Sequence, residues 1–234
     1  MTPRPITSIR CVEVTSRCNL ACAYCLHPIM TRPKVDMTDA IWDRVKVWVQ
    51  HFVDAGTQGE INLAGTGEPT LHPHLARYCL EMREILGPSR ALQFTTNGRG
   101  ATEALARALK PSKPAIMVTA HHAKMAQDAT YVYATHEILR GISLDPVLAP
   151  QDWAGQVDCP SPWMLPHIHP QRPLCELLNE AVGSINADGT FVICCMDGTG
   201  ESVRGTVWDD PKTTTITVQD WRLCPSCWQV PPKD

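Results

Sequence analysis

Three cysteines near the start of the chain have the residue type and spacing needed to hold a metal cluster. Cys18, Cys22 and Cys25 form the pattern C-x3-C-x2-C on one short segment. Three thiolates can bind three irons of a four-iron cluster and leave the fourth iron open to a substrate or cosubstrate, which indicates catalysis. The alternative is a zinc site, in which His27 would supply the fourth ligand of a structural zinc.

Two further motifs follow short apolar segments. Gly65-Thr66-Gly67-Glu68-Pro69 comes directly after the first of these segments, and Thr96-Asn97-Gly98 ends the second. Glycines allow the backbone to approach a ligand closely, and the Glu68 carboxylate can accept hydrogen bonds from a charged amine. Asn-Gly alone is an ordinary turn signal. Its position after a predicted strand is what indicates a site.

These three motifs, in this order, resemble those of the radical S-adenosylmethionine (SAM) enzymes. The family's cysteine motif is C-x3-C-x-aromatic-C, and Tyr24 stands at the aromatic position. The resemblance implies that Cys18, Cys22 and Cys25 bind a [4Fe-4S] cluster whose open iron is chelated by SAM. It also implies that reductive cleavage of SAM yields a 5'-deoxyadenosyl radical, which abstracts hydrogen from a substrate.

The same resemblance assigns the SAM contacts. Glu68 would bind the ammonium group and Tyr24 would lie near the adenine. The full set of cofactor-binding candidates is Tyr24, Gly65, Gly67, Glu68, Pro69, Asn97 and Thr119. Thr66 departs from the adjacent glycines of the commonest GGEP motif but leaves the Gly-Glu-Pro core intact. His121 is a further catalytic candidate, as a substrate contact or an acid-base group, with a hydrogen-bonded loop residue as the alternative.

The elements that must position these residues alternate along the first two-thirds of the chain. Apolar runs predict strands, and apolar residues at helical spacing predict helices between them. The expected strands are Ile9–Val14, Ile61–Ala64, Leu92–Thr95, Ala115–Thr119 and Ile142–Leu148, and the expected helices are 38–56, Leu75–Leu86, Thr102–Leu109 and Lys124–Leu139. Repeated strand-helix units predict an α/β fold, here an open partial (β/α) barrel of about five to six parallel strands.

In barrels of this kind the ligand site lies at the carboxyl ends of the strands. The cysteine loop, Glu68, Asn97 and His121 each follow an expected strand. We therefore expect all of them at one mouth of the barrel, which would occupy residues 1–148.

The last third of the chain has a different pattern. Closely spaced prolines predict a linker or lid at 149–174, because proline excludes long helices and central strands. In 175–234, two apolar runs around Asp188-Gly189 predict a β-hairpin. Four cysteines surround it, namely Cys175, Cys194, Cys224 and Cys227.

This arrangement resembles the twitch domain, the short version of the SPASM extension of radical SAM enzymes. The resemblance implies that these four cysteines bind an auxiliary [4Fe-4S] cluster, so that the chain carries two clusters. A zinc ribbon remains the alternative for this segment. Cys195, next to Cys194, is a possible alternative ligand, and Cys159 has no assigned role.

Length and composition set further bounds. The chain has 234 residues and a net charge of −3, which provides no bulk attraction for nucleic acid or acidic membranes. It lacks the apolar stretches of about 18 residues typical of a membrane span, and its first residues lack the apolar run of a signal peptide. We expect a cytoplasmic protein, in which the eleven cysteines indicate metal binding.

The expected reaction is the oxidation or dehydrogenation of a small polar substrate, with electrons from a flavodoxin- or ferredoxin-type donor. The auxiliary cluster would accept an electron or position the substrate, or else act as a structural staple. Two other reactions remain open. One is rearrangement of a modified nucleotide or nucleic acid, as in phage DNA hypermodification, and the other is modification of a ribosomal peptide. A non-catalytic zinc-binding module is the alternative from another class.

Overall fold

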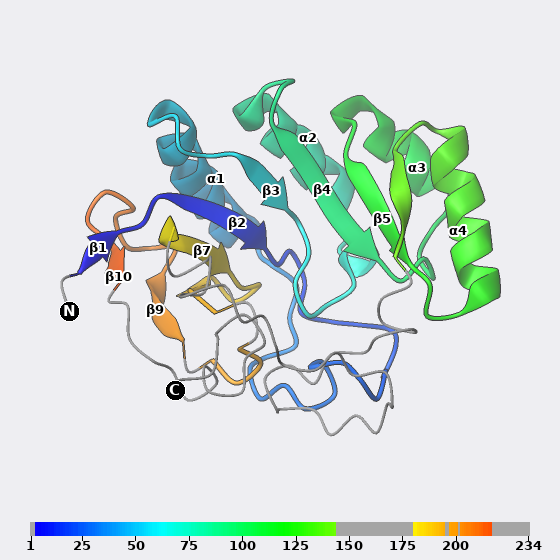
Figure 1. Cartoon of the computed structure of the whole chain (residues 1–234), viewed down its shortest axis with the longest axis horizontal. Helices are drawn as coiled ribbons and strands as arrows, with labels where there is room; N and C mark the ends of the chain where they lie inside the picture. Colours follow the sequence, from blue (N-terminus) through cyan, green and yellow to red (C-terminus); the bar gives the residue numbers. More distant parts are fainter. Residues whose placement is uncertain (1–2, 144–179, 195–196, 201, 217–234) are drawn as a thin grey trace, which may run out of the picture.

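The computed structural model describes residues 3–143, 180–194, 197–200 and 202–216, which form an α/β fold around one large sheet (Figure 1). The sheet has eight strands in the order β6-β5-β4-β3-β2-β7-β8-β9. Their bounds are β2 Ser8–Val12, β3 Glu60–Asn62, β4 Ala91–Thr96, β5 Ala115–Thr119, β6 Leu139–Ser143, β7 Val182–Ile185, β8 Thr190–Val192 and β9 Val203–Thr206. A separate pair joins β1 Arg4–Pro5 to β10 Thr215–Ile216.

Six of the strands in this sheet are parallel, from β6 to β7. The predicted hairpin around Asp188-Gly189 is present, because β7 and β8 pair antiparallel. Its first strand, however, also pairs in parallel with β2 and so becomes the sixth strand of the barrel sheet. All four residues of β7 are buried, as is typical of a strand covered on both faces. The domain boundaries themselves stay a prediction.

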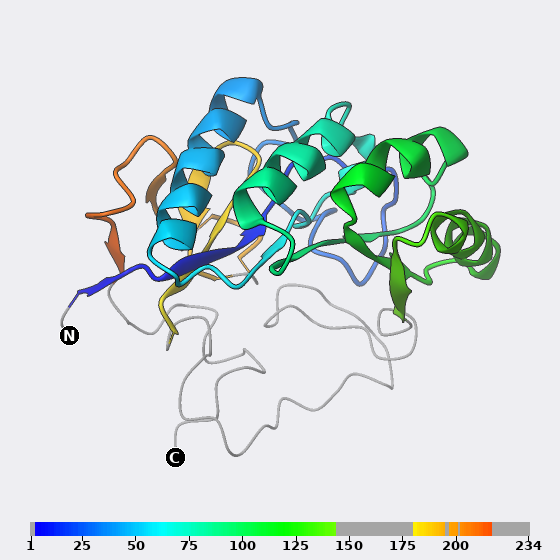
Figure 2. The same ribbon diagram turned by 90° about the horizontal axis from the view of Figure 1, so that it is seen from above.

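Four α-helices lie along one face of the sheet, as Figure 2 shows most clearly. They are α1 Asp39–Asp54, α2 Leu75–Leu86, α3 Glu103–Leu109 and α4 Ala123–Thr135. Two of them begin at threonine N-caps, since Thr38 accepts from the N–H of Ile41 and Thr102 accepts from that of Leu105. Two short 3-10 helices, η1 Pro69–Leu71 and η2 Lys110–Ser112, complete the helical elements of this part of the chain.

The prediction for the last helix and the following strand was wrong at their junction. The helix α4 ends at Thr135, and Leu139 begins β6 instead of ending the helix. Glu137 has a φ of 61°, a left-handed conformation that stops the helix. Leu139 then pairs with Ile116 of β5, so the sheet decides where the strand begins. The predicted continuation from 144 to 148 lies outside the described residues.

The core fills the space between the helices and the sheet. The rings of Trp42 on α1 and Tyr78 on α2 stack with centroids 4.1 Å apart. Trp48, further along α1, is fully buried and donates its indole N–H to the carbonyl of Val207 at 3.0 Å. These contacts join α1 to α2 and to the segment that follows β9. Within the described ranges, none of the helices has the length and apolar character to cross a bilayer.

Candidate active site

Loops that follow β2, β3, β4 and β5 meet at the carboxyl edge of the sheet, as the alternating pattern predicted. Glu68, in the loop after β3, lies among these loops and is 3% exposed. Its Oε1 accepts from the hydroxyl of Thr96 at 2.6 Å and from the hydroxyl and N–H of Thr70 at 2.7 and 3.1 Å. Its Oε2 accepts from the N–H of Asn97 at 2.7 Å. Glu68 therefore fixes the end of β4 against its own loop.

Asn97 connects the end of β4 to the cysteine loop. Its side-chain amide donates to Oδ1 of Asn19 at 2.8 Å and lies 4.0 Å from Sγ of Cys18. The Arg99 guanidinium donates to the carbonyl of Asn19 at 3.0 Å. The cysteine loop and the Thr-Asn-Gly turn are thus held together by contacts that no local sequence pattern specifies.

The loop after β5 contacts the cysteine loop through His121. Its Nδ1 lies 2.6 Å from the Tyr24 hydroxyl oxygen and 3.9 Å from Sγ of Cys22. The two rings stack with centroids 5.8 Å apart. Burial lowers the pKa of His121, and the neighbouring His122 lowers it further. His121 therefore stands, as predicted, among the residues of this edge.

All three thiols of the cysteine loop are partly buried. Burial raises the pKa of Cys18 and of Cys25, and the proximity of Cys22 raises both further. Bound iron would reverse this effect, because a metal cation stabilises the thiolate. Over the described ranges, no three His, Cys, Asp or Glu side chains converge as ligands of one metal ion. Three thiols on one loop are the donor set that a four-iron cluster with one open iron requires.

Gly65 and Gly67 are explained by close approach within the chain itself. A Cβ on Gly65 would lie 2.6 Å from Oε1 of Glu13, and a Cβ on Gly67 would overlap the carbonyl oxygen of Thr15. The N–H of Glu68 also donates to the carbonyl of Arg17 at 2.8 Å. The glycines thus let the loop after β3 pack directly on the chain that leads into the cysteine loop.

The other cofactor-binding candidates lie at the same edge with fewer contacts. Pro69 is buried and is the first residue of η1, where its missing N–H is tolerated. Thr119 is the last residue of β5 and is 5% exposed. Within the described residues, no hydrogen bond joins the Thr119 side chain to the cysteine loop. Its role as a SAM contact stays a prediction.

For the auxiliary site the structure describes one of the predicted ligands, Cys194, which is partly buried just after β8. Its N–H is 3.3 Å from the hydroxyl oxygen of Ser202. The Asp197 carboxylate organises the following turn, because it accepts from the N–H groups of Thr199, Gly200 and Ser202. The remaining cysteines lie outside the described residues, namely Cys159, Cys175, Cys195, Cys224 and Cys227.

Several residues of this edge were not identified from the sequence. Thr70 and Thr96 bind the Glu68 carboxylate, and Glu13 and Arg32 form a buried ion pair that binds Thr66 of the same loop. The sequence offered a weak signal, because Glu13 is one of two charged residues, with Arg10, in the expected strand Ile9–Val14. The partners of Glu13 come from other loops, so the sequence alone did not indicate them.

Comparison with known proteins agrees with this architecture. Residues 12–170 match the family model described as the Radical SAM superfamily. Among solved structures, BtrN in complex with AdoMet and 2-DOIA is similar, with a TM-score of 0.67 and 20% identity over 88% of this chain and 80% of that one. So is anSMEcpe with bound AdoMet and Cp18Cys peptide, with a TM-score of 0.60 and 12% identity over 88% and 79% of the two chains. At these identities the likeness shows the fold.

Two curated relatives match over shorter segments. Molybdenum cofactor biosynthesis protein 1 of Bos taurus is 30% identical over 112 residues, which are 46% of this chain and 17% of the relative. A tungsten-containing aldehyde ferredoxin oxidoreductase cofactor-modifying protein of Pyrococcus furiosus is 31% identical over 98 residues, 42% of this chain and 26% of the relative. The matched segments thus span less than a third of either relative. Because the family match covers more than half of the residues, this chain belongs to the radical SAM superfamily of enzymes, which implies SAM and a [4Fe-4S] cluster.

Proposed function

We propose that this protein cleaves SAM reductively at a [4Fe-4S] cluster bound by Cys18, Cys22 and Cys25, and oxidises a small polar substrate by hydrogen abstraction. The observation that carries the proposal is the position of Glu68. One buried carboxylate lies between the loop after β3 and the end of β4, and its neighbour Asn97 reaches Cys18. A ligand bound to the open iron would therefore meet an anionic side chain.

The chain's own residues have separable roles in this proposal. When bound, the cluster and SAM supply the electron and the carbon radical that removes hydrogen from the substrate. Glu68 orients SAM through its ammonium group. An ionised carboxylate has about four acceptor positions, two on each oxygen. Among the described residues, Oε2 of Glu68 accepts one bond, from Asn97, which leaves it a position for the ammonium.

His121 and Tyr24 would close the opposite side of the site. The pair holds the loop after β5 against the cysteine loop. In this position His121 is a candidate substrate contact, and Tyr24 a candidate neighbour of the adenine. Thr119, at the end of the same strand, would line the SAM site.

A small polar substrate is supported by the fold neighbour BtrN, which was crystallised with AdoMet and 2-DOIA. A peptide substrate is the second candidate, because the neighbour anSMEcpe binds AdoMet and the Cp18Cys peptide. The two curated relatives are named for the biosynthesis and for the modification of a cofactor, not of a peptide. We therefore place small polar molecules first.

The auxiliary cluster is the second part of the proposal. Cys175, Cys194, Cys224 and Cys227 would hold a [4Fe-4S] cluster that accepts the substrate's electron or positions the substrate. In support, Cys194 follows β8 on the hairpin whose other strand pairs with β2, the strand that leads into the cysteine loop. The two cysteine sites would thus follow strands of the same sheet that are separated by one strand, β7.

The experiment is anaerobic reconstitution with iron and sulfide, reduction with dithionite, and measurement of 5'-deoxyadenosine formed from SAM. We expect formation by the wild-type protein and none by Cys18→Ala. Cys11→Ala is the matched control, because Cys11 lies within β2 instead of in the loop. A protein that binds zinc without iron, or that leaves SAM intact after reduction, would overturn the proposal. Candidate small molecules and peptides added to the assay then distinguish the substrate classes.

A further inference from the structure

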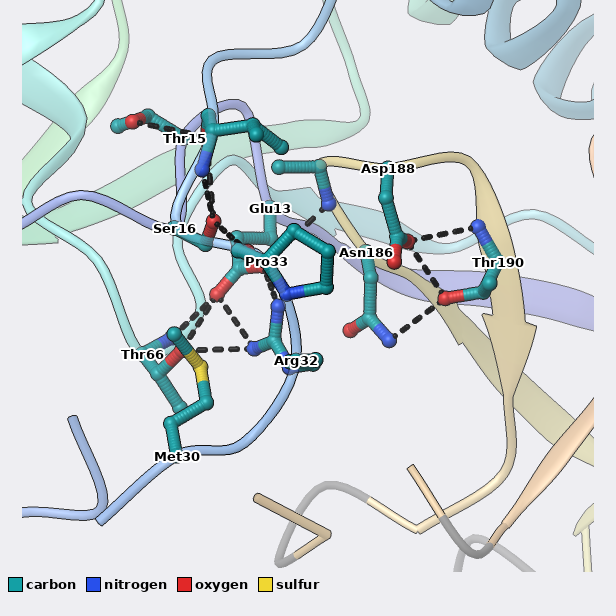
Figure 3. A network of polar contacts seen from close by, with 12 residues as sticks. Glu13, Thr15, Ser16, Met30, Arg32, Pro33, Thr66, Asn186, Asp188 and Thr190 are labelled. Carbon is teal, nitrogen blue, oxygen red and sulfur yellow. Dashed lines mark hydrogen bonds and ion pairs between the residues drawn. The ribbon is translucent and has the colours of Figure 1, made fainter. Parts of the chain in front are cut away.

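A buried ion pair stands beside the candidate active site. Arg32, on the segment that returns from the cysteine loop, donates through its two terminal nitrogens to the two carboxylate oxygens of Glu13, at 2.5 and 2.8 Å. The two side chains are 8% and 3% exposed. Figure 3 shows Glu13 at the centre of the contacts, between Arg32 and Thr66.

Thr66 connects this pair to the Gly-Thr-Gly-Glu-Pro loop. Its hydroxyl lies 2.7 Å from Oε1 of Glu13, to which it donates, and accepts from Arg32 at 2.7 Å. Its backbone N–H also donates to the same carboxylate oxygen at 2.8 Å. Thr66 is the residue that departs from adjacent glycines in the motif. Its side chain therefore has a partner that a glycine would not have.

The same carboxylate reaches the hairpin, and the start and end of the cysteine loop are joined nearby. The N–H of Ala187, in the turn between β7 and β8, donates to Oε2 of Glu13 at 3.3 Å. The hydroxyl of Ser16 donates to the carbonyl of Pro33 and accepts from the N–H of Val35, both at 2.8 Å. These contacts fix the two ends of the cysteine loop relative to the loop after β3.

Stability alone is a weak explanation for the pair. Burial of two charges carries a desolvation penalty, and well-packed apolar residues of similar volume are often equally or more stabilising. Nε of Arg32 is buried without a hydrogen-bond partner among the described residues, which adds to that penalty. What the pair provides is fixed geometry, because a guanidinium and a carboxylate meet in a defined bidentate arrangement.

We propose that Glu13, Arg32 and Thr66 are positioning residues that set the Gly65–Pro69 loop at a fixed distance from the cysteine loop. SAM would have to contact both loops at once, so their separation would determine its affinity. This inference rests on the proposed function, since it concerns how the chain holds the proposed cofactor. In this network the Thr66 hydroxyl makes contacts with Arg32 and Glu13 that a glycine at the same position could not make.

The first test compares Thr66→Val with Thr66→Ser. Valine keeps the branched shape and removes the hydroxyl, whereas serine keeps the hydroxyl. We expect wild-type iron and sulfide content after anaerobic reconstitution for both. For Thr66→Val we expect a Kd for SAM raised about 5- to 20-fold, in line with the loss of one buried hydrogen-bonding group. For Thr66→Ser the Kd should stay within about twofold of the wild type. Unchanged SAM affinity in Thr66→Val would overturn the positioning role.

The second test replaces the whole ion pair in the double variant Glu13→Leu/Arg32→Met. No buried charge is left without a partner, but the N–H groups of Thr66 and Ala187 lose their acceptor. We therefore expect a Tm below that of the wild type and above that of the single variant Glu13→Leu. We also expect a Kd for SAM raised about tenfold or more, since the loops lose their fixed separation. Wild-type affinity for SAM in the folded double variant would show a purely structural pair and overturn the inference. Thr66→Val decides the matter if the double variant does not fold.

Failure of the proposed function is distinguishable from failure of the positioning role. Wild-type protein that takes up no iron and binds no SAM would overturn the proposed function, and the positioning role with it. Wild-type protein that binds SAM tightly, together with variants that bind it equally tightly, would overturn the positioning role alone.

Discussion

The hydroxyl oxygen of Tyr24 lies 2.6 Å from Nδ1 of His121, although 97 positions separate the two residues in the chain. Tyr24 stands between Cys22 and Cys25 of the cluster motif, and His121 follows β5. Their contact joins the cysteine loop, which follows β2, to the loop after β5. Of the four strands whose loops meet at this edge, β5 lies farthest from β2 in the sheet. The loop thus depends on the far side of the site for its position.

His121→Ala removes this contact. We expect the rate of 5'-deoxyadenosine formation to fall by a factor of about 3 to 10, because one hydrogen bond contributes about 1 kcal/mol. The control is His122→Ala, since His122 is exposed and makes no side-chain cap bond to α4. The measurement is kcat/KM for SAM cleavage by the reconstituted protein. Equal rates for the two variants would show that His121 has no part in the reaction.

Glu68→Gln alters a carboxylate that accepts from four donors. An amide presents N–H groups to some of these donors, so we expect a loss of about 1 to 3 kcal/mol in the free energy of unfolding. We also expect weaker SAM binding. Glu60→Gln is the control, because Glu60 forms a partly exposed ion pair with Arg10. Exposed pairs contribute about 0 to 1 kcal/mol, so this control should remain near wild type in denaturant unfolding.

Gly67→Ala tests the close approach of two loops. The new methyl group would overlap the carbonyl oxygen of Thr15, so the loop after β3 must move away from the chain entering the cysteine loop. We expect destabilisation by about 1 to 3 kcal/mol, as for other overpacking substitutions, together with weaker SAM binding. At Gly59 a Cβ would meet nothing within 4 Å. Gly59→Ala should therefore be stable and bind SAM normally, and the same behaviour in Gly67→Ala would contradict the structure.

Acid should weaken one contact at the start of α1. Hydrogen bonds from Tyr78, Arg77 and His74 lower the pKa of Asp39 from 3.8 to about 2. A carboxylate with a lowered folded-state pKa stabilises the protein above its unfolded pKa, and this contribution is lost as the pH falls through the folded value. The Tm difference between wild type and Asp39→Asn should therefore be constant at neutral pH and shrink between about pH 4 and pH 2.

This difference should be small throughout, because Asp39 is exposed and water screens its contacts. The reference is Asp54→Asn at the other end of the helix, whose carboxylate binds Gln50 and no cation among the described residues. A Tm difference that stays constant down to pH 2 would contradict the assigned pKa of Asp39.

Iron content tests the auxiliary cluster. Wild-type protein should contain about eight irons after reconstitution, and Cys194→Ala about four, because each cubane cluster holds four. Cys11→Ala should keep the wild-type content, since Cys11 lies in β2. About four irons in the wild type, with no loss in Cys194→Ala, would remove the second cluster from the proposal.

Local sequence determined the chemistry and most of the elements. The spacing of Cys18, Cys22 and Cys25 indicates the family without any tertiary contact, because ligand spacing on one loop is a local property. The first residues of α1 and α3 follow from their threonine N-caps, which bind N–H groups three residues away. Helices of this kind are specified by neighbours in the chain.

Tertiary structure decided how the pieces combine. The sequence did not place β7 beside β2, because strand pairing joins segments with no local signal for one another. Nor did it separate α4 from β6 correctly, since the register of β6 is set by β5. The Glu13–Arg32 pair and the Tyr24–His121 contact have the same origin. Cysteine spacing thus specified the cofactor class, whereas long-range packing and buried charge specified the geometry that would hold it.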